Sequence, residues 1–150
     1  GHQLSKEIAQ GRRSATNYHR HIQRTNRLYG PENILVNFIS NHDENSWNGT
    51  VKESYGAADH AFMAMNFTLP GMPLIYSGQE YDLNKRLRFF EKDSFPKVAG
   101  KTMELLQQLG ALKNNHRALA AGTSAGSYKR INTTRDNQIL AFERRWLTSL

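Results

Sequence analysis

The sequence contains no cysteine. Disulfides and thiolate metal sites are therefore excluded, and redox chemistry gives no indication of the compartment. Long apolar runs are missing too: none approaches the roughly 20 residues that cross a bilayer, so we predict no membrane span. The first ten residues, GHQLSKEIAQ, also lack the apolar stretch of a signal peptide. Localisation stays open on these grounds.

The chain does have the composition of a globular domain and an excess of positive charge. Its 150 residues are 38% hydrophobic and 10% aromatic, which is enough for one domain with a core. The net charge of +7 raises the alternative of a nucleic-acid-binding protein. Part of the excess comes from a group of arginines, Arg12, Arg13, Arg20, Arg24 and Arg27. Because no recognition-helix, RNA-binding or finger motif accompanies them, we favour a solvated helix face and predict no nucleic-acid partner.

Hydrophobic periodicity predicts three helices that alternate with two strands. The helices are expected at 14–29, 54–68 and 98–115, and the strands at 34–39 and 72–78. Gly30-Pro31 and Pro70-Gly71 end the first two helices. The order helix, strand, helix, strand, helix is typical of parallel α/β architecture.

The composition changes near Ala120, where AAGTSAGS is small and flexible. Beyond it, the pattern of residues 128–146 predicts two short strands joined by a turn at 135–137. This is a hairpin rather than another α/β unit. We therefore expect a domain boundary between residues 121 and 122.

Polar residues follow both predicted strands. They are Asn41, His42 and Asp43 after the first strand and Gly78, Gln79 and Glu80 at the end of the second. Ligands of parallel α/β proteins bind at the carboxyl ends of the strands. Two such ends suggest a cleft for a polyhydroxylated ligand, with Trp47, Tyr76 and Tyr81 available to stack on sugar faces. The alternative is that Asn41 and Asp43 only form the turn, and spacing alone does not decide between the two.

Four segments carry a family resemblance through their order and spacing. They are FISNHD, PGMPLIYSGQE, LLQQLGALKNNHRAL, and the pair GSYKRI and ILAFERRW. In turn they resemble the strand-seven motif, the strand-eight segment, the last barrel helix and the first C-terminal β strands of the alpha-amylase superfamily of glycoside hydrolases. The loop 84–95, NKRLRFFEKDSF, further resembles bacterial alpha-amylases. The resemblance covers the chain from about Tyr18 onward.

The resemblance implies a fold and an activity. The fold is the C-terminal part of a (β/α)8 TIM barrel, about units six to eight, over residues 1–121, followed by the start of an all-β sandwich domain over 122–150. The activity is retaining hydrolysis of α-1,4-linked glucans such as starch and maltooligosaccharides, by a nucleophile and a general acid. In the family both groups come from strands four and five. Their motifs are missing here, so this chain alone is expected to be inactive.

A few of the family's residues can be assigned to this chain. Asp43 matches the third carboxylate, which stabilises the developing positive charge without attacking, and His42 matches a histidine that binds sugar hydroxyls. Asn41 is a candidate substrate-binding residue, and bracing of the strand end is its favoured role. Trp47 is a candidate stacking platform or, alternatively, a loop tryptophan folded back on its own barrel.

The residues after the second strand have a different expected role. Gln79 and Glu80 are expected to have a structural role or to contact the residues that bind the substrate. Direct contact with the sugar is the less favoured alternative. No cofactor or metal is predicted in this chain. His19 and His21 are two residues apart on a helix and point to different sides, whereas a shared metal needs i, i+4 spacing. The resemblance allows calcium in the missing part of the enzyme.

Other functions on the same fold stay open. A non-catalytic glucan-binding protein is one, although the presence of Asp43 and His42 argues against it. A transglycosylase and an α-glucosidase of the same superfamily are others. The expected partners are an α-glucan and the missing N-terminal part of the barrel, and uncovered strands predict self-association of the isolated chain. By resemblance, the location is extracellular or periplasmic.

Overall fold

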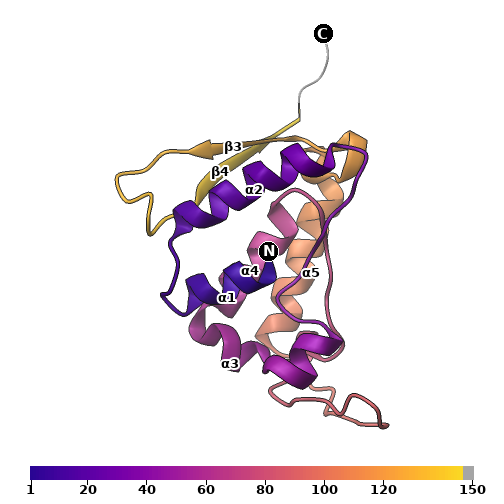
Figure 1. The fold of residues 1–150 in the computed structure, drawn as a ribbon. Helices are drawn as coiled ribbons and strands as arrows, with labels where there is room; N and C mark the ends of the chain where they lie inside the picture. Colours follow the sequence, from indigo (N-terminus) through magenta and orange to yellow (C-terminus); the bar gives the residue numbers. More distant parts are fainter. Residues whose placement is uncertain (147–150) are drawn as a thin grey trace.

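A computed structural model describes residues 1–146 of the chain. The α-helices are α1 (His2–Ala9), α2 (Ala15–Tyr29), α3 (Val51–Tyr55), α4 (Asp59–Thr68) and α5 (Lys101–Asn115). The strands are β1 (Val36–Asn37), β2 (Met72–Pro73), β3 (Ser127–Ile131) and β4 (Ala141–Arg145). Short helical turns complete the fold: the π-turn η1 (Glu44–Asn48) and the 3-10 turns η2 (Gly56–Ala58), η3 (Gln79–Tyr81), η4 (Arg117–Leu119) and η5 (Gly122–Ser124). Figure 1 shows the arrangement of these elements.

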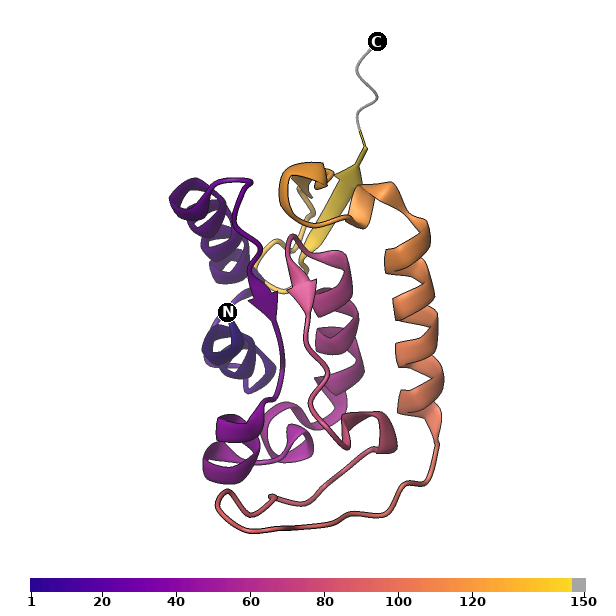
Figure 2. The same ribbon diagram turned by 90° about the vertical axis from the view of Figure 1, so that its right-hand side faces the viewer.

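β1 and β2 form a parallel pair with Val36 opposite Met72. Figure 2 shows the two strands side by side, with α1 and α2 on one side and α4 and α5 on the other. The chain order α2, β1, α4, β2, α5 confirms the predicted α/β alternation. Both strands are shorter than the expected 34–39 and 72–78. In the described part of the chain each has a single hydrogen-bonded neighbour, and Pro73 offers no N–H to the ladder.

The main core lies between α3, α4, α5 and the segment after β1. Its buried side chains are Ile39, Tyr55, Phe62, Met63, Phe67, Leu106 and Leu109. Ile39 is 1% exposed, whereas Val36, three residues earlier in the same apolar run, is 51% exposed. A strand buried on both faces would cover both residues. The described elements therefore bury only some of the apolar side chains in and around β1.

The helix boundaries follow local signals. Ser14 and Asn17 form a capping box at the start of α2, and α2 ends at Gly30, close to the predicted 14–29. The single helix predicted over 54–68 is wrong, because the chain makes two helices there. Gly56, with φ of 54°, ends α3 in a conformation that disfavours other residues, and α4 starts after the turn η2.

The sequence pattern did not predict α1. The fully buried residues of α1 are Ser5 and Lys6, whereas its apolar Leu4 and Ile8 are only partly buried against the two cores, so the apolar signal in the sequence is short. α5 begins at Lys101 rather than at the predicted Val98, with Gly100 at its N-cap position.

β3 and β4 form the predicted antiparallel hairpin, with Ser127 opposite Arg145. The hairpin packs on α2 and on the end of α4. The side chains of this second core are Tyr18, Ile22 and Leu69, joined by Tyr128, Leu140 and Phe142. The boundary between residues 121 and 122 stays a prediction. None of the helices in residues 1–146 is both long and apolar enough to cross a membrane.

Candidate functional site

The site begins four residues after β1, in a turn that Asn41 shapes. The side-chain Oδ1 of Asn41 accepts a hydrogen bond from the backbone N–H of Glu44 at 2.8 Å, and its carbonyl accepts one from the N–H of Asn45 at 2.9 Å. These bonds start η1, which begins at Glu44. Asn41 therefore does form the turn, as one of the two alternatives expected.

His42 and Asp43 project from this turn to the surface. The Nε2 of His42 lies 3.6 Å from Oδ2 of Asp43, and the two side chains are 66% and 58% exposed. An imidazole and a carboxylate side by side offer a ligand both hydrogen-bond donors and acceptors. Asn41 can therefore form the turn while His42 and Asp43 remain available to a ligand.

A long loop, residues 82–100, is fastened across the same turn. The buried amide of Asn45 donates to the carbonyl of Lys85 at 3.1 Å and accepts from the N–H of Leu87 at 2.8 Å. The hydroxyl of Ser46 donates to the carbonyl of Leu87 at 2.7 Å. Figure 2 shows this loop at the end of the molecule toward which both strands point. Asn45 and Ser46 therefore hold the two loops of the site together.

An ion pair fastens the loop a second time. The guanidinium of Arg86 donates to both carboxylate oxygens of Glu53, each at 3.0 Å. The Arg86 guanidinium and the backbone N–H of Thr50 lower the pKa of Glu53 to about 2. The hydroxyl of Thr50 also donates to Oδ1 of Asn84 at 2.7 Å.

Three aromatic side chains, Trp47, Phe89 and Phe90, form an exposed surface that we call the aromatic shelf. The ring centroid of Phe89 lies 5.3 Å from that of Trp47, 4.8 Å from that of Phe90 and 5.7 Å from that of His42. Phe90 is 85% exposed, and Trp47 is exposed as well. The shelf thus continues the surface of His42 and Asp43 with flat apolar faces.

Phe89 and Phe90 were not among the sequence-predicted site residues. The only signal was the aromatic pair in loop 84–95, and nothing in the spacing placed that loop against Trp47. For Trp47 the structure gives an intermediate outcome: its ring packs on the neighbouring loop and still presents surface to solvent.

The polar residues after β2 shape a turn of their own. Gln79 is buried, and its Oε1 accepts from the N–H of Tyr76 at 3.3 Å. A carboxylate oxygen of Glu80 accepts from the N–H of Gly78 at 2.9 Å. Gly78 has φ of 92°, and a Cβ there would lie 2.6 Å from the Leu83 side chain, so glycine is required. The role of Gln79 and Glu80 toward a bound sugar stays a prediction.

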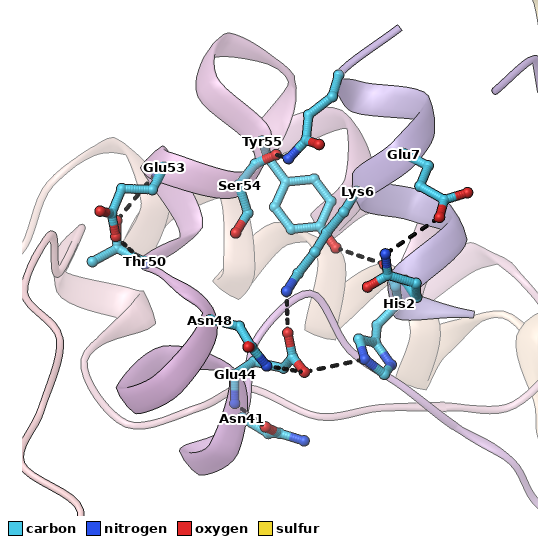
Figure 3. Close-up of polar contacts among 12 residues, drawn as sticks. His2, Lys6, Glu7, Asn41, Glu44, Asn48, Thr50, Glu53, Ser54 and Tyr55 are labelled. Atoms are coloured by element: carbon cyan, nitrogen blue, oxygen red, sulfur yellow. Dashed lines mark hydrogen bonds and ion pairs between the residues drawn. The ribbon is translucent and has the colours of Figure 1, made fainter. Parts of the chain in front are cut away.

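Behind the exposed His42 and Asp43 lies a buried charged cluster around Glu44, drawn in Figure 3. The carboxylate of Glu44 pairs with the ammonium of Lys6, lies 3.2 Å from Nε2 of His2 and accepts from Nδ2 of Asn48 at 3.1 Å. Burial raises the pKa of Glu44, but Lys6, Asn48 and His2 outweigh burial and keep that pKa below its ordinary value.

Neither Glu44 nor Lys6 was a predicted site residue, because 38 positions separate them and no local pattern links them.

Two further predictions concerned metals and nucleic acid. His19 is buried, and its Nδ1 lies 3.1 Å from the Tyr128 hydroxyl. Within residues 1–146, no group of three or more His, Asp or Glu side chains is placed to hold a metal ion. Arg20, Arg24 and Arg27 lie exposed on α2. The prediction that these arginines bind no nucleic acid is not tested.

The fold is that of part of the α-amylase structures, which confirms the predicted resemblance at the level of fold. A noncanonic maltogenic α-amylase from Thermotoga neapolitana matches 93% of this chain with a TM-score of 0.78 and 21% identity. An α-amylase from Lactobacillus plantarum matches 93% with a TM-score of 0.74 and 22% identity. A cyclomaltodextrin glucanotransferase with a three-domain ABC distribution matches 97% with a TM-score of 0.69 and 21% identity.

The chain spans about a third of each of these proteins, namely 32%, 31% and 29% of their lengths in the same order. No protein-family model and no curated protein sequence matches it.

Asn45→Ala tests whether one amide holds the two loops together. The change removes both hydrogen bonds to the loop and leaves the Leu87 N–H and the Lys85 carbonyl without their partner, so we expect the free energy of unfolding to fall by about 1–3 kcal/mol. Amide exchange at residues 85–90 should accelerate more than elsewhere. Asn114→Ala, at an exposed position of α5, is the control and should change neither quantity. Unchanged exchange in Asn45→Ala would contradict the clamp.

Proposed function

We propose that this chain is part of a retaining α-amylase-type glycoside hydrolase that cleaves α-1,4-glucans such as starch and maltooligosaccharides. The observation that carries the proposal is the exposed His42–Asp43 pair at the carboxyl end of β1, next to the aromatic shelf. The likeness of the fold to two α-amylases and a cyclomaltodextrin glucanotransferase supports it.

In the proposed reaction Asp43 acts on charge rather than as a nucleophile. Retaining glycosidases pass through a transition state resembling an oxocarbenium ion, in which positive charge grows on the sugar ring. An ionised carboxylate held beside that ring stabilises the charge, and this stabilisation is stronger in the transition state than in the bound substrate. His42 hydrogen-bonds hydroxyls of the same sugar. The nucleophile and the general acid would come from outside this chain, so we propose that it is inactive alone.

The aromatic shelf is suited to the glucan chain. Pyranose rings have apolar faces of C–H groups, and aromatic side chains stack on such faces while the hydroxyl edges stay hydrogen-bonded. Trp47 and Phe90 pack on Phe89, whose ring neighbours His42, so the three rings enlarge the surface beside His42, which fits a polymer better than a single sugar. The hydrogen bonds of Asn45 fix the shelf in advance, which lowers the entropic cost of binding.

We propose, as the architecture of the whole enzyme, that β1 and β2 are the seventh and eighth strands of a (β/α)8 barrel. Two pockets, of about 270 and 290 Å³, lie between α2 and residues 69–71, and Val36 and Asn37 of β1 line the first of them. In the described part of the chain, the edge of β1 that does not pair with β2 has no strand partner. A barrel strand from the rest of the enzyme would pair with this edge and help to cover Val36.

A second candidate function is transglycosylation, favoured by the match to the cyclomaltodextrin glucanotransferase. Both reactions share the first step, and the acceptor then decides between water and a sugar hydroxyl. The products separate the two functions. Shorter linear oligosaccharides alone indicate hydrolysis, and longer or cyclic products from a pure oligosaccharide indicate transfer.

Asp43→Asn in the complete product of the gene tests the assigned role. The amide keeps the shape and removes the charge, so we expect kcat on maltooligosaccharides to fall by roughly two orders of magnitude or more, as for the loss of one preorganised electrostatic group. Glu104→Gln, which neutralises an exposed carboxylate on α5, should leave kcat unchanged. Normal turnover in Asp43→Asn would remove Asp43 from the mechanism.

Phe90→Ala tests the shelf as a surface for the polymer. Loss of one stacking ring should weaken binding of long maltooligosaccharides by about 0.5–1.5 kcal/mol while maltotriose binding changes less. Val98→Ala, which removes an exposed apolar side chain elsewhere on the same loop, is the matched control. Calorimetric titration with oligosaccharides of increasing length measures both. Equal losses at every length would contradict a shelf that extends the site.

The barrel proposal predicts that the isolated chain self-associates. Open strand edges and exposed apolar side chains such as Val36 and Met72 favour pairing with a second copy. Light scattering on a sizing column, over a hundredfold dilution, should give a mass that depends on concentration. A monomer with a cooperative melt at every concentration would show that the missing strands are not needed for this fold.

A further inference from the structure

The Lys6–Glu44 ion pair is buried directly behind the exposed surface of the site. Its side chains are 9% and 12% exposed, and the two residues come from different elements, α1 and η1. Figure 3 shows the Lys6 side chain descending from α1 to the Glu44 carboxylate, with His2 and Asn48 completing the cluster. Lys6 thus contributes its charge to the turn that carries His42 and Asp43.

The backbone and the side chain of Glu44 are both fixed. Its N–H donates to Asn41 at one end, and its carboxylate is held by Lys6 and Asn48 at the other. Glu44 follows Asp43 in the sequence. A peptide unit fixed on one side leaves its neighbour few backbone conformations, so the Glu44 contacts restrict where the Asp43 carboxylate can lie.

Stability alone does not account for a charged pair at this place. Burying two charges is costly, and apolar residues of similar volume often stabilise a fold as well or better. An ion pair does differ from an apolar contact in one respect, because a buried charge must keep its one partner and few alternative packings provide it. Such a contact sets one orientation of α1 relative to η1 rather than a range of orientations.

We propose that Lys6 and Glu44 are positioning residues, which hold the turn of His42 and Asp43 in the geometry that acts on the glucan. The inference rests on the proposed function for its effect on catalysis. The contact itself stands on the structure. The role assigns a task to α1: it supplies the cation that locks the turn after β1.

The experiment uses the complete product of the gene and three variants of the pair. Lys6→Met leaves the Glu44 carboxylate buried without its cation, and Lys6→Arg keeps the positive charge. The double variant Lys6→Met/Glu44→Gln removes both charges and keeps an oxygen that can accept from Asn48. Glu7→Gln is the matched control, because it neutralises a carboxylate of the same helix that contacts Arg13 at the surface.

We expect Lys6→Met to lower both the melting temperature and kcat, and Lys6→Arg to restore most of each. The double variant should recover the melting temperature, since no unpaired buried charge is left, while kcat stays about 10- to 100-fold low with KM little changed. A merely structural role predicts instead that kcat recovers together with the melting temperature. Recovery of both in the double variant would overturn the proposal.

Amide hydrogen exchange over residues 40–49 separates this inference from the proposed function. Exchange there should accelerate in Lys6→Met and in the double variant and stay unchanged in Glu7→Gln. If Asp43→Asn keeps full activity but the exchange pattern holds, the glycosidase role fails and the positioning of the turn stands. If exchange over 40–49 is unchanged in the double variant, the positioning role is wrong whatever the activity.

Discussion

The parallel pairing of β1 and β2 is the constraint on which the site depends. Two parallel strands cannot be joined by a tight turn, so the chain must cross over between them, and α3 with α4 makes that crossing. The crossing brings the carboxyl ends of both strands to one side of the molecule. The turn that follows β1 and the loop that follows β2 can therefore meet, although 42 positions separate Asn45 from Leu87.

Where the turn and the loop meet, buried residues hold the two segments together and exposed residues face the solvent. Asn45 and Glu44 point inward and hold the loop and the turn, while His42, Asp43 and Phe90 point outward. The division follows the chain residue by residue, because Asp43 and Glu44 are neighbours with opposite exposure. A site of this kind gains its precision from polar contacts that the ligand never touches.

Sequence reasoning recovered the parts of the fold that have a local signature. The apolar spacing of α2 and the Gly30-Pro31 stop predicted the bounds of that helix, and the pattern of residues 128–146 with its turn at 135–137 predicted the hairpin. Parallel strands after alternating helices predicted Asn41, His42 and Asp43 at a carboxyl end, and in the structure they lie in the turn that follows β1, four to six residues after Asn37. α3 was missed because the helix predicted over 54–68 ran through Gly56 without a break, whereas Gly56 has a positive φ and separates two helices.

The contacts that complete the site could not be predicted in the same way. α1 buries a serine and a lysine beside the partly buried Leu4 and Ile8, so its inner face is partly polar in the sequence. The amide of Asn45 and the carboxylate of Glu44 find partners about 40 positions away, and no spacing rule reaches that far. The sequence does not distinguish a polar residue that tertiary packing buries from one that is exposed to solvent.

The same long-range contacts set the order in which the molecule can assemble. Closing a loop of about 40 residues costs chain entropy before any contact offsets it, whereas the turns of α2 and α5 form locally. During synthesis from the N-terminus, the turn after β1 emerges well before Leu87, its partner in the loop. We therefore expect the helices to form before residues 41–48 reach their final conformation. That conformation should be fixed only after β2 has paired with β1 and the loop 82–100 has packed against the turn.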